Sequence, residues 1–243
     1  MGFGQKRDVS FMKTPPSTLA WSGLSVGYRT EHPILSHLRG SLVNGGLHVF
    51  IGRNGTGKST LIRTLAGLQR PLSGEVRLNE RKIHEMEARA RAACVAYVDS
   101  TPPRASELSV GEVLSLVEPD AHIAREVLGG MGAASWWERR LDTLSDGQSQ
   151  RVMLVRAALQ QTPWILLDEP TAFLDVPARK AFWNMAEEHA RKGCGLIVAT
   201  HDYAELANME MLASVTLVKN GALTSLDPLQ TAEEWTAQMG AEL

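Results

Sequence analysis

The sequence of 243 residues has few cysteines, little excess charge and no long apolar run. Its two cysteines, Cys94 and Cys194, lie a hundred positions apart, a spacing that fits neither zinc ligands nor a disulfide framework. The 25 Lys and Arg residues nearly balance the 27 Asp and Glu residues, which argues against a nucleic acid as the main partner. No stretch approaches the ~18 consecutive apolar residues of a membrane span, and the N-terminus lacks the apolar core of a signal peptide. We therefore expect a chain in a reducing compartment with no membrane span of its own.

Short apolar runs alternate with amphipathic segments along most of the chain, which predicts an α/β fold. We expect strands at "LHVFI", "EVRLN", "CVAYV", "WILLDEP" and "GLIVATHD". Helices are expected at 58–69, 85–92 and 177–192, and Pro177 suits the first turn of the last of these. From about Ser106 to Gln161 the pattern is mainly helical without strands, which indicates a helical insertion. The Asn-Gly pair in "VTLVKNGALTSL" predicts a hairpin with a type I′ turn.

A glycine-rich segment, "GRNGTGKST", stands between an expected strand and an expected helix. It fits the pattern G-x-x-x-x-G-K-[ST] with Gly52, Gly57, Lys58 and Ser59. Bare glycine backbone can turn several N–H groups onto phosphate oxygens, and the helix N-terminus adds its favourable dipole. Lys58 supplies positive charge, and the Ser59 hydroxyl can ligate Mg²⁺. The segment therefore predicts a site for the phosphates of a nucleotide.

Two carboxylates and a histidine follow the expected buried strands. "ILLDE" places Asp168 and Glu169 at the end of one strand, and "VATHD" places His201 at the end of another. Because side chains alternate along a strand, Asp168 is expected to hold a metal through water while Glu169 polarises a water for attack on a γ-phosphate. His201 could donate a hydrogen bond to that phosphate. Two solvated acids at a strand end are the alternative, which the neighbouring phosphate loop disfavours.

A second segment, "TLSDGQSQRV", also has the features of an anion site. Ser145 can cap a helix, and Gly147 leaves its backbone bare, so that free N–H groups can face a phosphate. One nucleotide needs only one phosphate loop. The second segment therefore needs a task other than holding the nucleotide that the phosphate loop of the same chain already holds.

Together these residues resemble the nucleotide-binding subunit of an ATP-binding cassette (ABC) transporter, over about Leu19 to Leu226. "GRNGTGKST" corresponds to the Walker A loop, "ILLDE" to Walker B, "LSDGQ" to the family signature, "TAFLD" to the D-loop and "ATHD" to the switch histidine. All five occur in the family's order. Tyr28 matches the aromatic residue that stacks on adenine, and a strand tyrosine packed on the core is the alternative.

The resemblance implies a fold of the α/β class, with a P-loop NTPase (RecA-like) core, an antiparallel β subdomain and an inserted helical subdomain. Residues 1–243 would form one ABC ATPase domain, with the core at about 19–100 and 162–226 and the helical subdomain at about 101–161. Two such cassettes pack head to tail in the family, so that each nucleotide lies between one chain's phosphate loop and the other chain's signature. The implied cofactors are ATP and Mg²⁺.

The resemblance also implies a set of site residues. The catalytic residues would be Glu169, His201 and Lys58, and the metal-binding residues Ser59 and Asp168, with Ser100 as a third candidate. The nucleotide-binding residues would be Tyr28, Gly52, Arg53, Asn54, Gly55, Thr56, Gly57, Lys58, Ser59, Thr60, Ser145, Gly147, Gln148 and Asp175.

Two positions depart from the family pattern, and one pair of aromatics invites a question. The family usually has glycine at Asp146, whose carboxylate we expect to face away from the triphosphate on the first turn of a helix. Near Ser100 the family normally has glutamine, and serine is too short for the same contact without a bridging water. Adjacent Trp136 and Trp137 cannot both face one side of a helix, so one is expected in the core; packing is the favoured interpretation for each, and exposure of the other at the surface where the family docks its membrane partner is the alternative.

Several functions remain to be compared. The favoured one is an ATPase subunit at the cytoplasmic face of a membrane, which powers a separate permease and works with an extracytoplasmic substrate-binding protein. "LSDGQ" with "EPTAFLD" looks most like bacterial importers of iron chelates, haem or cobalamin, and export is the alternative. An ABC protein of DNA repair or translation would usually show a long coiled-coil insertion or two cassettes. A lone kinase or GTPase would give the signature no purpose, and a nucleotide sensor without turnover is the fourth possibility.

Overall fold

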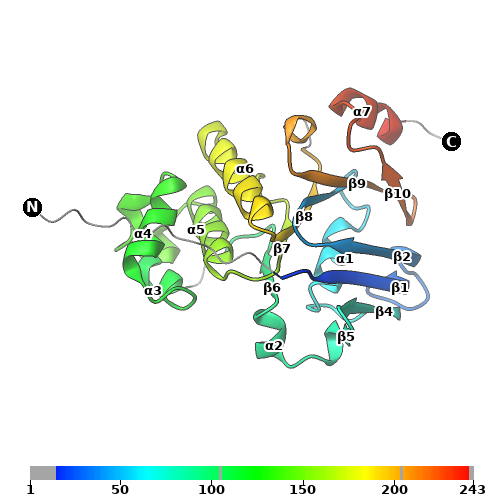
Figure 1. The fold of residues 1–243 in the computed structure, drawn as a ribbon, viewed down its shortest axis with the longest axis horizontal. Coiled ribbons are helices and arrows are strands. Elements are labelled where there is room, and N and C mark those ends of the chain that lie inside the picture. Colours follow the sequence, from blue (N-terminus) through cyan, green and yellow to red (C-terminus); the bar gives the residue numbers. More distant parts are fainter. Residues whose placement is uncertain (1–14, 104–105, 203–204, 241–243) are drawn as a thin grey trace, which may run out of the picture.

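The computed structural model describes residues 15–103, 106–202 and 205–240, in which two sheets and several helices form the fold (Figure 1). The larger sheet has the strand order β10-β9-β3-β8-β7-β6. Its strands are β3 (Leu47–Ile51), β6 (Val95–Val98), β7 (Trp164–Asp168), β8 (Gly195–Thr200), β9 (Leu212–Lys219) and β10 (Ala222–Leu226). All are parallel except β10, which pairs antiparallel with β9. Every residue of β3, β7 and β8 is buried, as expected for central parallel strands covered on both faces.

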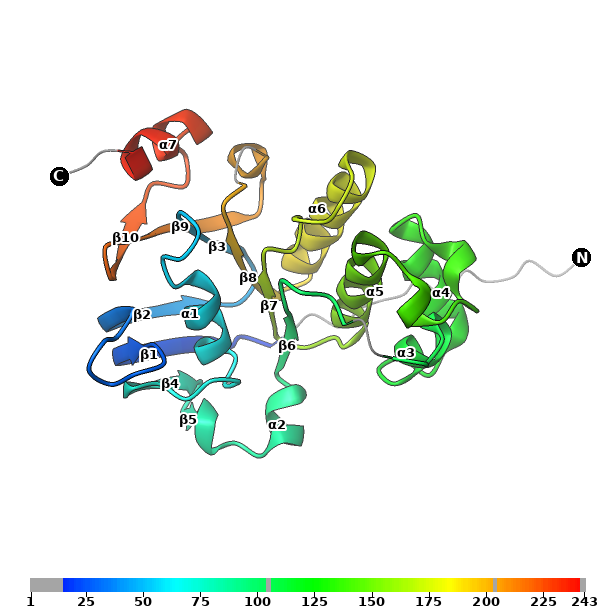
Figure 2. The ribbon, with the colours of Figure 1, turned by 180° about the vertical axis from the view of Figure 1, so that it is seen from behind.

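The smaller sheet is antiparallel and has the strand order β2-β1-β4-β5. Its strands are β1 (Thr18–Val26), β2 (Leu35–Val43), β4 (Ser73–Leu78) and β5 (Arg81–Lys82). Helix α1 (Lys58–Leu65) packs against β1 of this sheet and against β7 and β8 of the larger one (Figure 2). Alternating side chains of β3, β7 and β8 therefore enter two separate cores, one on the α1 side and one on the opposite side.

The helical insertion lies between β6 and β7 in sequence. It contains α3 (Val110–Ser115), α4 (Ala121–Gly130) and α5 (Asp146–Leu159), and α3 and α4 stand at the end of the molecule remote from the smaller sheet in both views (Figures 1 and 2). The other helices are α2 (Ala88–Ala92), α6 (Val176–Arg191) and α7 (Ala232–Gly240). Short 3₁₀ turns occur at Ile83–Glu85, Ala134–Trp136, Leu141–Thr143 and Leu206–Asn208. No helix among the described residues is long and apolar enough to span a bilayer.

The predicted α/β fold with an antiparallel sheet and inserted helices is confirmed. The hairpin is confirmed in detail: Lys219 pairs with Ala222, and both turn residues, Asn220 and Gly221, have positive φ, as a type I′ turn requires. Trp137 is buried in the core and Trp136 is partly buried and packs against it, which agrees with the favoured interpretation that both pack. The proposed residue boundaries of the core and helical subdomain stay a prediction.

Two predicted helices are shorter in the structure. The apolar spacing predicts that the first reaches residue 69, but it ends at Leu65, because Gly67 has a left-handed φ of +73° and its N–H bonds back to the Thr64 carbonyl. The second is predicted at 85–92, whereas a 3₁₀ turn occupies part of this segment and α2 begins only at Ala88. Neither difference displaces a residue of the predicted site.

Candidate nucleotide-binding site

The phosphate loop leaves the carboxyl end of β3 and leads into α1. Its glycines are required by their surroundings: a Cβ at Gly52 would lie 2.5 Å from the Val218 carbonyl oxygen, and one at Gly57 would lie 2.6 Å from a methyl group of Ile34. Gly57 also has a φ of +99° and occupies the N-cap position of α1, where no side chain caps the helix. The first N–H groups of α1 therefore remain available for an acceptor, which suits an anion.

The ammonium group of Lys58 occupies the centre of this loop. Its Nζ donates to the carbonyl oxygens of Gly52 at 2.7 Å and Arg53 at 3.2 Å, and it lies 3.4 Å from Oε1 of Glu169. The side chain is only 5% exposed. A cation is thus held where the loop's bare backbone would meet a phosphate, and the charge is already opposed by one carboxylate.

Asp168, the last residue of β7, lies beside the first turn of α1. The Ser59 hydroxyl donates to its Oδ1 at 2.9 Å, whereas its Oδ2 is buried and has no hydrogen-bond partner among the described residues. Burial raises the pKa of Asp168, and the neighbouring carboxylates of Asp99 and Glu169 act in the same direction. A bound cation would supply the missing partner and remove much of this penalty.

The residues present fit Mg²⁺ in particular. The described part of the chain has no cluster of three or more His, Cys, Asp or Glu side chains that could form a complete protein cage for a metal. Mg²⁺ seldom uses such a cage, because it keeps several waters and takes one or two protein ligands together with substrate phosphates. Ser59 and Asp168 offer that kind of partial site beside the phosphate loop.

Glu169 and His201 lie side by side at the ends of β7 and β8. The Glu169 carboxylate accepts the His201 backbone N–H at 3.3 Å and lies 2.8 Å from Nδ1 of the His201 ring. Glu169 is 15% exposed and His201 is 52% exposed, so the pair lies at the border of the core. The backbone φ of Glu169 is +46°, a costly conformation for a residue with a side chain, and its N–H bonds to the Ala199 carbonyl at 2.8 Å. This constraint aims the carboxylate between Lys58 and His201.

Tyr28 follows β1 and is 71% exposed. Its hydroxyl lies 3.5 Å from the hydroxyl of Thr60, which belongs to the first turn of α1. The alternative of a tyrosine packed in the core is therefore wrong, and an exposed ring stands beside the phosphate loop. Its stacking on adenine stays a prediction.

The signature segment forms the start of α5. Ser145 is its N-cap and forms a reciprocal capping box with Gln148: the Ser145 hydroxyl accepts the Gln148 N–H, and the Gln148 side chain accepts the Ser145 N–H. A Cβ at Gly147 would lie 2.4 Å from the Phe173 carbonyl oxygen. The glycine is thus required by the approach of the D-loop backbone, a reason that the motif alone did not reveal.

Asp175 is the last D-loop residue and the N-cap of α6. Its carboxylate accepts the Ala178 N–H at 2.9 Å and pairs with Arg151 of α5 at 2.7 Å. The hydrogen bond from the Ala178 N–H is the main reason that the pKa of Asp175 is lowered. The predicted role of Asp175 in nucleotide binding is not tested by these contacts, which join the D-loop to the signature helix.

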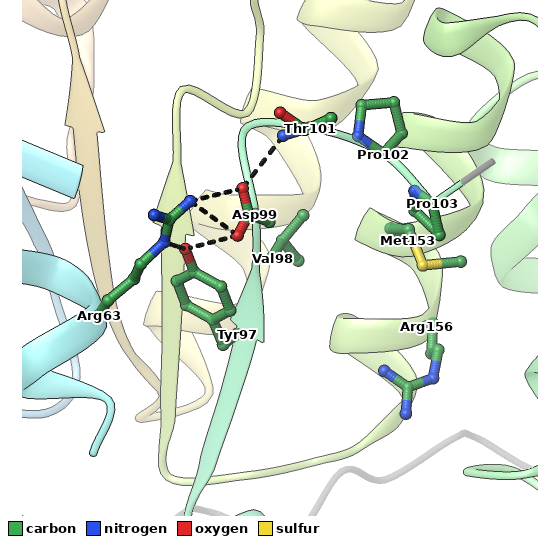
Figure 3. Close-up of a pocket in the computed structure, with 9 residues that line it drawn as sticks. All are labelled: Arg63, Tyr97, Val98, Asp99, Thr101, Pro102, Pro103, Met153 and Arg156. Carbon is green, nitrogen blue, oxygen red and sulfur yellow. Dashed lines mark hydrogen bonds and ion pairs between the residues drawn. The ribbon is translucent and has the colours of Figure 1, made fainter. Parts of the chain in front are cut away.

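The loop after β6 borders a cavity of about 480 Å³ (Figure 3). Asp99 accepts two hydrogen bonds from Arg63 at 3.0 Å each, and the Ser100 hydroxyl donates to Asp99 at 3.3 Å. Burial acts to raise the pKa of Asp99, but the Thr101 N–H and the Arg63 guanidinium outweigh it, and the pKa is lowered. Arg156 and Met153 line the opposite side of the cavity. Ser100 is therefore engaged by its neighbour, and its predicted contact with a metal stays a prediction.

The structure brings one group of predicted residues together and leaves the other apart. At the carboxyl edge of the larger sheet, Ser59 bonds to Asp168, and Lys58 and His201 both pair with Glu169, the next residue along the chain. Within residues 15–103, 106–202 and 205–240, no such bond joins Ser145, Gly147 or Gln148 to that group.

Three arginines that the sequence pattern does not single out organise these elements. Arg63, Arg151 and Arg179 each pair with an aspartate of a different segment. Their partners are 23 to 36 positions away, so no local motif marks them.

A parallel sheet with a phosphate loop after β3 and two acids after β7 defines an α/β P-loop nucleotide hydrolase. A sequence profile described as "ABC transporter" matches residues 35–172, more than half of the chain. The chain belongs to the ABC transporter family and is an ATPase cassette of that family.

Curated relatives include import subunits. The iron(3+)-hydroxamate import ATP-binding protein FhuC of Bacillus subtilis is 31% identical over 230 residues, which cover 87% of this chain and 85% of that protein. The hemin import ATP-binding protein HmuV of Gloeobacter violaceus is 34% identical and covers 74% of this chain and 70% of its own length. The cytochrome c biogenesis ATP-binding export protein CcmA of Cupriavidus pinatubonensis is 32% identical, and the match covers 78% of this chain and 91% of that protein.

Solved structures agree with the fold. The ATP-binding subunit of an ABC transporter superimposes with a TM-score of 0.79 at 27% identity, covering 92% of this chain and 99% of that one. A dimeric ATP-binding cassette in a post-hydrolysis state with ADP and phosphate gives a TM-score of 0.75 at 20% identity, covering 87% and 99%. At this lower identity the likeness concerns the fold alone.

Proposed function

We propose that this chain hydrolyses ATP with Mg²⁺ and so powers import of an iron chelate, haem or cobalamin through a separate permease. The observation that carries the proposal is the arrangement of Lys58, Glu169 and His201 around the end of the phosphate loop. Ser59 and Asp168 lie beside them, and one Asp168 carboxylate oxygen has no hydrogen-bond partner in the part of the chain that the structure describes. These groups match the needs of phosphoryl transfer: a cation for the phosphates, a place for the metal and a carboxylate for the attacking water.

Each side chain has a separate role in this mechanism. The loop N–H groups and Lys58 bind the β- and γ-phosphates, and Glu169 orients the attacking water and accepts its proton. His201 donates to the γ-phosphate while its Nδ1 stays near Glu169. Ser59 and Asp168 would hold Mg²⁺, which would supply charge compensation for the phosphates when bound. Tyr28 stacks on the adenine from its exposed position.

A second copy of the chain closes the nucleotide from the other side. Ser145 and the backbone around Gly147 are separate from the phosphate loop group, which supports contact with the nucleotide of another chain. Phe173 and Val176 of the adjoining D-loop region expose large apolar side chains that such a partner would cover. Hydrolysis then removes the γ-phosphate between the two chains and lets the dimer open.

The relatives support the proposed import substrate and the other proposed partners. FhuC and HmuV are import ATP-binding proteins for iron(3+)-hydroxamate and hemin, which favours an iron chelate or haem as the cargo. The permease would hold this chain at the cytoplasmic face of the membrane, and a substrate-binding protein would deliver the cargo on the other side. CcmA, an export protein of similar identity, favours export as the second candidate function.

Uptake measurements test the proposal. In a strain that lacks this gene, uptake of a labelled iron hydroxamate, haem and cobalamin would be compared after complementation with the parent chain or with Lys58→Ala. The exposed Lys180→Ala variant is the matched control. We expect the parent and the control to restore uptake of one of these substrates and Lys58→Ala to fail. Normal uptake of all three without the gene would contradict import.

A further inference from the structure

An ion pair ties the loop after the switch histidine to α6. Nη1 of Arg179 lies 2.7 Å from Oδ2 of Asp202, the residue that follows His201. Both side chains are about one third exposed or less, and the Nε of Arg179 is buried. A short charge-assisted contact between partly buried groups is stronger and more directional than an ordinary surface pair.

The backbone of Asp202 is held as well. Its N–H donates to the Thr200 hydroxyl at 2.9 Å, and that hydroxyl lies 3.2 Å from the Asp202 carbonyl oxygen. Thr200 is fully buried at the end of β8. His201 thus stands between a residue anchored in the sheet and a residue anchored to α6, and its ring lies 2.8 Å from Glu169.

We propose that Arg179 is a positioning residue for ATP hydrolysis, which acts through Asp202 to keep the His201 ring beside Glu169. This inference rests on the proposed ATPase mechanism. Arg179 has no contact with the phosphate loop among the bonds of the described residues; its partner is Asp202. An error of about 1 Å in the position of a catalytic group can cost on the order of 100-fold in rate. The ion pair of Arg179 with Asp202 beside His201 therefore affects the rate of ATP hydrolysis more than the binding of ATP.

A second ion pair holds the N-terminal end of α6. Asp175, the N-cap of α6, pairs with Arg151 of α5, whose first turn carries the signature. Arg179 lies one turn further along α6. The two pairs therefore fix the switch loop and the signature helix to one rigid element, and the position of His201 depends on where α6 is held.

Steady-state kinetics give the first test. Arg179→Ala and Asp202→Asn should each lower kcat by about tenfold and leave the KM for ATP within about twofold, because the phosphates are bound elsewhere. Arg179→Lys should retain part of the rate. The control is Arg191→Ala, which removes an arginine on the same helix that pairs with Glu187 and Glu210. We expect it to match the parent.

Epistasis separates positioning from general stability. In a His201→Ala background, measured by single-turnover hydrolysis of labelled ATP, Arg179→Ala should cause no further loss, since the residue that it positions is gone. An equal loss in both backgrounds would overturn the proposal. So would a KM that rises as much as kcat falls.

A spectroscopic measurement makes the test independent of turnover. The His201 ring resonance is assigned by its disappearance in His201→Ala, in the protein without nucleotide. Arg179→Ala and Asp202→Asn should shift it, while Arg191→Ala should not. An unshifted resonance in both variants contradicts the proposal. A parent chain that does not hydrolyse ATP contradicts the proposed function instead, and the resonance still decides whether Arg179 positions His201.

Discussion

The phosphate loop and the signature segment both begin a helix with glycine nearby, yet their first turns are built in opposite ways. Helix α1 starts at Lys58, after the left-handed N-cap residue Gly57, and among the described residues no side chain caps its first N–H groups. Helix α5 starts with a complete capping box between Ser145 and Gln148, and the Phe173 carbonyl packs on Gly147. The first is built to surround an anion. In the second, the capping box already satisfies the Ser145 and Gln148 N–H groups within the chain.

The charges around the two helix starts differ in the same sense. The start of α1 gathers Lys58, Asp168 and Glu169, which can bind phosphate, hold a metal and accept a proton. The start of α5 has the pair of Arg151 with Asp175, which joins two elements of the same chain. Two similar motifs are thus built differently: the start of α1 gathers groups suited to phosphate chemistry, whereas the start of α5 is joined to the D-loop of its own chain, as we expect of a segment that completes the site of a second copy.

The largest expected effect is the loss of ATP hydrolysis when the carboxylate beside the phosphate loop is removed. Glu169→Gln should lower kcat by at least about 100-fold, because the amide cannot accept the proton of the attacking water, while ATP binding is preserved. Phosphate release and binding of a fluorescent ATP analogue measure the two quantities. Glu188→Gln, an exposed acid on α6, is the control and should behave as the parent. Equal turnover by Glu169→Gln and the parent would remove Glu169 from its role.

The second largest effect is expected from a substitution in the signature that leaves the phosphate loop unchanged. Gly147→Ala should lower kcat by about tenfold, because its methyl group would push the D-loop carbonyl away and misplace the segment that closes the nucleotide. ATP binding to the single chain should stay unchanged. In Gly130→Ala the added methyl group meets no atom within 4 Å, and that variant serves as the control. If Gly147→Ala weakened ATP binding by single chains as much as turnover, the separation of the two sites' roles would be wrong.

A smaller effect is expected for the contact between Tyr28 and the adenine of ATP, beside the phosphate loop. Tyr28→Ala should raise the KM for ATP about fivefold, since aromatic stacking contributes about 1 kcal/mol. Tyr28→Phe should preserve the KM. Because the ring is 71% exposed, the free energy of unfolding should change little in either variant. A large loss of stability with an unaltered KM would support a packing role instead.

The smallest effect concerns the metal. Ser100→Gln should lower by about twofold the Mg²⁺ concentration needed for half-maximal hydrolysis, because a longer side chain can reach the neighbourhood of Asp168. Asp99 is not expected to supply this metal contact in place of residue 100, because its carboxylate is engaged by Arg63. Ser100→Ala is the control and should not lower the requirement. A higher requirement in Ser100→Gln would mean that another group already occupies this place.

The predictable part of this protein is the part encoded in consecutive residues. The phosphate loop, the acids after β7 and the Asn-Gly turn each depend on local geometry, so their positions on strands, loops and helices follow from the pattern. The strand-end placement of Glu169 and His201 also follows, because parallel strands bring their carboxyl ends to one edge. The contact of 2.8 Å between them then needs only neighbouring strands.

What the sequence did not disclose depends on contacts between distant segments. The pairs of Arg63 with Asp99 and of Arg179 with Asp202 join elements whose packing no local pattern determines. The strained φ of Glu169 is equally invisible in sequence, because nothing in the letters distinguishes it from an extended residue. The predicted length of helix α1 is too great because the turn at Gly67 overrides the apolar spacing that continues beyond it.

Cross-linking between two introduced cysteines would show whether the signature of one chain completes the nucleotide site of another. Cys94 and Cys194 are replaced by serine, Thr56→Cys is introduced in the phosphate loop, and Leu144→Cys is introduced at the first residue of the signature. With a short bis-maleimide, we expect a covalent dimer on a denaturing gel. Its yield should rise with ATP in a Glu169→Gln background and fall in either single-cysteine chain. An internally bridged monomer, or a yield that ignores ATP, would contradict this role of the signature.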